Sequence, residues 1–124
     1  MLRRLVMLAL ACTTMVACSV DSTGPNGSVA GTYTLRRING QNLPYTLPSG
    51  RQLVSDQLTL YRDGTYEDVS QYSNASSTFD EGDYTNENGA VTFYSTSGDT
   101  YQGSVSGSVL TQILTNYTQV FERN

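Results

Sequence analysis

The most reactive side chains of this chain are carboxylates, and four of them are grouped in the segment FDEGDYTNENG, namely Asp80, Glu81, Asp83 and Glu87. Calcium binding needs about six to eight oxygen ligands that converge on one point, and this spacing does not match the loop of an EF-hand. A glycosidase pair needs two carboxyl groups about 5 to 9.5 Å apart across a cleft, of which the sequence shows no sign. We therefore expect a solvent-exposed hairpin with acidic flanks, no metal ligand and no catalytic residue.

The residue types that are absent restrict the chemistry further. The chain has no histidine and no lysine, and its only cysteines are Cys12 and Cys18. His-dependent catalytic triads and histidine-ligated zinc are therefore excluded. Serine and threonine are abundant, but no histidine or lysine is present to activate a hydroxyl group as a nucleophile. We predict a protein that is not an enzyme and that needs no cofactor.

Nine tyrosines and no tryptophan are the second notable feature of the composition. Tyrosine favours strands, and it combines an aromatic face with a hydroxyl group that can form hydrogen bonds. Tyr66, Tyr84, Tyr94 and Tyr101 fall in or near the middle of predicted strands. If they point inwards, they line a binding site for a flat or weakly polar ligand. The alternative is that they fill a small core and leave no room for a ligand.

Residues 1–17, MLRRLVMLALACTTMVA, have the layout of a secretory signal peptide: two arginines, an apolar run and small residues at the end. The run over residues 5–17 is shorter than the roughly 20 residues that a membrane-spanning helix needs. We therefore predict that this segment is cleaved and not retained as a transmembrane anchor.

The residues Met-Val-Ala before Cys18 resemble the bacterial lipobox, which ends in a small residue next to the lipidated cysteine. The resemblance implies that Cys18 becomes the first mature residue and carries several acyl chains, which together anchor a protein stably in a membrane. Cys12 is an alternative lipidation site, although it would leave an apolar run of residues 5–11 only. Ser19 favours the outer membrane of the bacterial cell envelope, since aspartate at this position signals retention in the inner membrane of enterobacteria.

Cleavage before Cys18 leaves 107 residues, which is enough for a single domain. Residues 18–29 are polar, contain glycine and proline, and have the composition of a flexible tether, so the domain is expected over residues 30–124. Eleven acidic residues and five remaining arginines give the mature chain a net charge of minus six. This charge argues against a nucleic-acid partner, because phosphate binding depends on clusters of lysine and arginine. We expect a monomer.

From residue 30 onward, short β-rich runs alternate with turn residues such as Asp63-Gly64 and Asn88-Gly89, which favour tight hairpins. This spacing predicts an all-β fold in which eight antiparallel strands form an up-and-down barrel, because closure removes exposed strand edges. The long connection over residues 39–51 contains two prolines and is the best candidate for a loop at the barrel mouth. The expected strands are residues 30–38, 52–62, 65–73, 78–85, 90–95, 100–106, 109–114 and 117–123.

Four segments, GTYTL, LTLYRDGTY, VTFYSTSGDTYQGSVSG and YTQVFER, resemble the small lipocalin-like lipoproteins of bacteria. Lipocalins have Gly-x-Trp on the first strand and a basic residue near the last. Gly31-Thr32-Tyr33 matches with tyrosine in place of tryptophan, and the resemblance implies that Arg123 packs over Tyr33 to close the barrel. It also implies a small, hydrophobic or aromatic ligand inside the barrel. The alternative is a structural or interaction protein of the cell envelope with a filled barrel and no ligand.

Overall fold

The structure, a computed structural model, describes residues 27–124. The predicted signal peptide, both cysteines and most of the predicted tether lie outside the described residues. Within the part described, no helix is long and apolar enough to cross a membrane.

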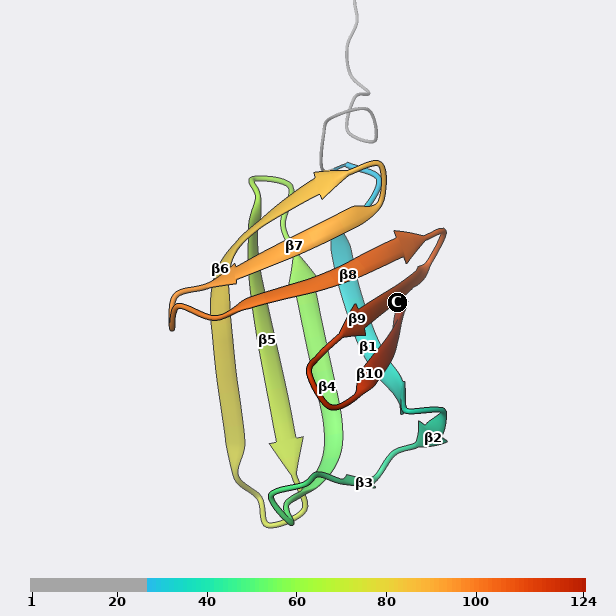
Figure 1. Cartoon of the computed structure of the whole chain (residues 1–124), viewed down its shortest axis with the longest axis vertical. Helices are drawn as coiled ribbons and strands as arrows, with labels where there is room; N and C mark the ends of the chain where they lie inside the picture. Colours follow the sequence, from blue (N-terminus) through green and yellow to red (C-terminus); the bar gives the residue numbers. More distant parts are fainter. Residues whose placement is uncertain (1–26) are drawn as a thin grey trace, which may run out of the picture.

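Eight long antiparallel strands form a closed barrel (Figure 1). Each strand pairs with the next along the chain, and the first pairs with both the second and the last, which closes the sheet on itself. The predicted eight-stranded antiparallel up-and-down barrel is therefore confirmed, and it is consistent with a lipocalin-like fold. The strands are β1 (Gly31–Ile38), β4 (Gln52–Leu60), β5 (Thr65–Tyr72), β6 (Ser77–Glu87), β7 (Ala90–Ser95), β8 (Thr100–Ser106), β9 (Val109–Ile113) and β10 (Thr118–Arg123).

The tight turns form at the predicted places by two different geometries. Asn88 and Gly89 both have positive φ, as the two central residues of a type I′ hairpin turn require. At Asp63-Gly64 only the glycine has positive φ, and the Tyr61 amide donates to the Thr65 carbonyl across a three-residue loop. The second turn is therefore one residue longer than the predicted two-residue hairpin.

The long connection between β1 and β4 contains two short strands that were not predicted, β2 (Gln41–Asn42) and β3 (Tyr45–Thr46). β2 pairs with the end of β1, and β3 pairs with the start of β4. Three side chains of this connection, Leu43, Tyr45 and Leu47, pack against the core. The connection is therefore attached to the barrel end that lies opposite the N-terminal entry of the chain (Figure 1).

The end at which the chain enters the barrel is closed by Tyr33 and Arg123. These residues are direct partners in the register of β1 and β10, and the guanidinium carbon lies 5.2 Å from the centre of the tyrosine ring. The Tyr33 hydroxyl donates to the Val29 carbonyl oxygen at 2.7 Å. The guanidinium group donates to the carbonyl oxygens of Ser28, Ala30 and Gly107. Arg123 thus joins the N-terminal segment, the last strand and the turn between β8 and β9.

Candidate functional site

The half of the barrel interior that lies away from Tyr33 and Arg123 contains a cavity of about 220 Å³ that opens to solvent. Its wall combines carboxylates, tyrosines and glutamines, whereas the closed half is packed with apolar side chains such as Phe121 and Leu110. None of the described residues that line the cavity is basic. The polar lining residues central to the site are Asp56, Asp68, Asp80, Tyr66, Tyr101, Tyr117, Gln112 and Gln119.

The three carboxylates come from neighbouring strands and meet because of the hairpin register. Asp68 of β5 is paired directly with Asp80 of β6, and its partner on β4 is Leu58, two residues from Asp56. Side chains alternate across a strand, so residues of equal phase share the inner face of the barrel. Like charges on directly paired positions destabilise a sheet. A group of three inward carboxylates therefore needs a compensating interaction.

Asp80 has two hydrogen-bond donors around its carboxylate. The Tyr66 hydroxyl donates to one oxygen at 2.8 Å, and the Ser95 hydroxyl donates to the other. Tyr66 is held in place by an edge-to-face contact with Phe93, in which the ring centres are 5.1 Å apart. Asp80 is thus fixed by neighbours from β5 and β7.

Asp56 and Asp68 are less well satisfied. Asp56 is only 3 % exposed, and one of its oxygens accepts a hydrogen bond from the Ser70 hydroxyl at 2.8 Å. The Oδ1 atoms of both Asp56 and Asp68 are buried and have no partner among the described residues. A buried acceptor without a partner is costly and rare in native structures. These two atoms are therefore the unsatisfied acceptors of two residues that line the cavity.

Burial raises the pKa of the Asp56 carboxyl group, and it raises the pKa of Asp68 well above its ordinary range. The Asp68 pKa rises further because Asp56 accepts its hydrogen bond and because the charges of Asp56 and Asp80 are close. The same hydrogen bond lowers the pKa of Asp56 and so opposes the effect of burial. The close approach of the two buried carboxyl groups therefore favours protonation of the pair, with the larger rise in pKa at Asp68.

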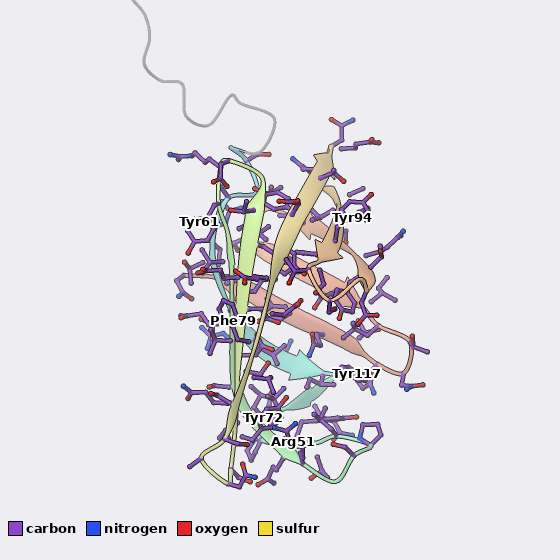
Figure 2. The ribbon with its side chains drawn as sticks, turned by 90° about the vertical axis from the view of Figure 1, so that its left-hand side faces the viewer. Arg51, Tyr61, Tyr72, Phe79, Tyr94 and Tyr117 are labelled. Atoms are coloured by element: carbon purple, nitrogen blue, oxygen red, sulfur yellow. The ribbon has the colours of Figure 1, made fainter. Side chains whose placement is uncertain are left out.

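The structure separates the four tyrosines that were expected to bind a ligand. Tyr66 and Tyr101 line the cavity. Tyr84 is buried, but it lies in the closed half of the barrel, where its hydroxyl donates to the Tyr61 carbonyl oxygen. Tyr94 follows the inward Phe93 and is 48 % exposed on the outside of β7 (Figure 2). Only two of the four tyrosines therefore contribute to the cavity. Tyr94 points to the outside of the barrel, and Tyr84 points inwards but lies too near the closed end.

The acidic segment is divided by the same alternation. Asp80 faces inwards, whereas Glu81, Asp83 and Glu87 are exposed on the outside of β6. Among residues 27–124, no group of His, Cys, Asp or Glu side chains is arranged to hold a metal ion.

Sequence reasoning missed Asp56 and Asp68, although a signal was present. Asp56, Asp68 and Asp80 are spaced twelve residues apart, which is about the spacing from one predicted strand to the next in this part of the chain. Asp56 also has the same phase as the apolar Leu58 and Leu60. A carboxylate that alternates in phase with buried apolar residues of the same strand is expected to point inwards.

No protein-family model, no curated protein and no solved structure matches this chain. The comparison with lipocalin-like proteins therefore rests on the closed eight-stranded barrel and on the place of Tyr33 and Arg123 at its closed end.

Proposed function

We propose that this protein is a lipid-anchored lipoprotein of the bacterial cell envelope, and that it binds a small molecule in the open half of its barrel. The observation that carries the proposal is the cavity of about 220 Å³ with unpartnered, buried carboxylate oxygens in its wall. A barrel filled by its own side chains, the sequence-based alternative, would leave no such space. The cavity therefore favours a binding protein over a purely structural one.

The dimensions of the cavity indicate a small ligand. Pockets for drug-sized molecules have volumes of about 300 to 1,000 Å³. The cavity of about 220 Å³ is smaller than this range. Its apolar wall, formed by Leu58, Leu114 and the tyrosine rings, suits a compact apolar or aromatic body. Its carboxylates and glutamines suit a polar group on the same molecule.

The proposed anchor leaves the cavity accessible. Arg123 fixes the carbonyl groups of Ser28 and Ala30 at the closed end of the barrel, so the chain from a lipidated Cys18 would reach the barrel there. The nine residues between Cys18 and Ser28 can span at most about 30 to 32 Å when fully extended. The closed end would therefore lie near the lipid surface, and the cavity would open away from it.

The anchor is tested by metabolic labelling with radioactive palmitate in the native bacterium. We expect the label to be incorporated into the wild-type protein and into a Cys12→Ala variant, and to be absent from Cys18→Ala. The Cys12→Ala variant is the matched control, because it also removes one cysteine from the predicted signal peptide. Loss of the label in Cys12→Ala with retention in Cys18→Ala would show that cleavage occurs at the other cysteine.

Ligand binding is tested by native mass spectrometry of the protein purified from its own envelope. We expect an adduct of small mass under native conditions, and its disappearance under denaturing conditions, because the cavity exists only in the folded barrel. Repeated preparations without an adduct, together with no response to a panel of lipids and aromatic compounds, would refute the proposed binding function.

A further inference from the structure

The cavity concentrates negative charge without a positive charge to balance it. Asp56, Asp68 and Asp80 lie on its wall, and no lining residue among those described is basic. Two arginines near the ends of the barrel, Arg51 and Arg123, interact elsewhere. Arg51 stacks over the Tyr72 ring at 3.7 Å and donates to Ser76, and Arg123 binds backbone carbonyl groups at the closed end. Buried carboxylates are costly unless a counterion or hydrogen-bond donors compensate them.

The unpartnered atoms of the site are all acceptors. Asp56 Oδ1 and Asp68 Oδ1 have no partner, and Asp80 accepts two hydrogen bonds although a carboxylate has about four acceptor positions. A primary ammonium group has three N–H donors and one positive charge. Resting on the proposed binding function, we propose that the cavity selects a small organic cation whose primary ammonium group is bound by Asp56, Asp68 and Asp80.

The remainder of the cavity fits the body of such a cation. Tyr66, Tyr101 and Tyr117 present aromatic rings to the same space as the three carboxylates. Aromatic faces attract cations, and they also pack well against a flat apolar group. A metal ion fits less well, because calcium requires about six to eight converging oxygens and no metal-binding group is arranged among the described residues.

Ammonium binding is coupled to the protonation of the Asp56–Asp68 pair. The titratable groups facing this pair are Tyr66 on β5, Asp80 on β6, Tyr101 on β8 and Tyr117 before β10, and the inward residues of β7, β9 and β10 at this level are neutral. The bound cation favours the ionised form of Asp68, so a proton held by the pair is released to solvent. Affinity for the ammonium ion should therefore decrease as the pH is lowered through the raised pKa of Asp68.

The test is isothermal titration calorimetry of the purified whole chain with three probes that share a phenyl ring: 2-phenylethylammonium, 2-phenylethanol and phenylacetate. Loss of hydrogen bonds to a charged group weakens binding by about tenfold or more. We expect the ammonium ion to bind at least about tenfold more tightly than the alcohol. We expect phenylacetate not to bind. We also expect proton release, measured from the dependence of the binding enthalpy on the buffer.

Variants locate the binding site. We expect Asp56→Asn and Asp68→Asn each to weaken binding of 2-phenylethylammonium at least about tenfold. Asp83→Asn is the matched control, since it removes the same charge from the exposed face of β6 and should leave the affinity unchanged. Thermal unfolding of each variant verifies that the barrel is folded.

The outcomes separate this proposal from the function on which it rests. Equal or tighter binding of 2-phenylethanol or phenylacetate would overturn the selection for a cation and leave small-molecule binding intact. Unchanged affinity in Asp56→Asn and Asp68→Asn, or displacement of the ammonium ion by stoichiometric calcium chloride, would also overturn it. Failure of all three probes together with the absence of an adduct in native mass spectrometry would refute the binding function itself.

Discussion

Replacing Gly82 by alanine is expected to lower the free energy of unfolding by about 3 kcal/mol or more, at the upper end of overpacking effects in well-packed proteins. Gly82 lies on the inner face of β6, where it pairs with Tyr66 of β5 and Ser95 of β7. A Cβ atom here would overlap the Tyr94 carbonyl oxygen and lie 3.0 Å from the Ser95 Cα atom. Both obstacles are backbone, so a side-chain rotation cannot relieve the overlap.

The close approach at Gly82 also shapes the cavity. Tyr66 and Ser95, its two register partners, are the residues that donate hydrogen bonds to Asp80. Separating β6 from β7 would therefore move the donors that fix this carboxylate. We expect the Gly82→Ala variant to lose affinity for a cavity ligand as well as stability.

Gly103→Ala provides a graded comparison for the same measurement. Gly103 is also an inward strand glycine, and a Cβ atom there would lie 2.6 Å from the Thr111 carbonyl oxygen and 3.4 Å from the Gln112 Cα atom. Because this overlap is smaller, we expect a loss of about 1 to 3 kcal/mol. Both values are measured by urea denaturation with linear extrapolation. A Gly82→Ala barrel within about 0.5 kcal/mol of the wild type would contradict the close approach of β6 and β7.

The strands were predictable because their signals are local. Each hairpin is specified by its own turn residues, such as Asn88-Gly89, and by a short β-rich run on each side. A meander of such hairpins has few alternative topologies, since each strand pairs with its sequence neighbour. The short strands β2 and β3 were missed because they are stabilised by the ends of β1 and β4 and by packing on the core, which local sequence does not reveal.

The candidate site was only partly predictable, for a different reason. Its composition depends on which residues of a strand face inwards and at what depth. Tyr94 of β7 and Tyr101 of β8 both lie within strands, but only Tyr101 has the inward phase. The presence of the cavity depends on the combined volume of side chains from many strands, and this quantity has no local signature. The meeting of Asp56 and Asp68 likewise follows from the register between β4 and β5.

Replacing Asp68 by asparagine is expected to raise the free energy of unfolding at neutral pH. In the folded barrel the pKa of Asp68 lies well above the value of about 3.9 in an unfolded chain. Between these two values the folded state binds more protons than the unfolded state, so the stability of the wild type decreases as the pH rises. The loss is complete above the folded-state pKa and amounts to roughly 1.4 kcal/mol for each pKa unit of difference. Asparagine has the same size as aspartate, never ionises, and carries an amide group that can donate hydrogen bonds.

The measurement is chemical denaturation of the wild type, Asp68→Asn and Asp83→Asn over a series of pH values from about 4 to about 8. Asp63, whose pKa is lowered by hydrogen bonds from Thr65, adds a slope of opposite sign. It does so equally in all three proteins, and the difference between the curves of the wild type and Asp68→Asn therefore reports the titration of the Asp56–Asp68 pair. We expect the wild type and Asp83→Asn to lose stability together as the pH rises, and Asp68→Asn to become the most stable of the three near neutral pH.

The pH series also bears on function. Replacing a residue that supports only the fold lowers the stability of the protein. Replacing a binding residue often raises it, because such residues are kept for function at a cost in stability. Asp68→Asn is expected to combine a more stable barrel with a weaker affinity for 2-phenylethylammonium. Parallel pH curves for the wild type and Asp68→Asn would show that the pKa of Asp68 is not raised in the folded barrel. A variant that is less stable at every pH would show that the buried carboxylate stabilises the barrel by itself and requires no cation to balance it.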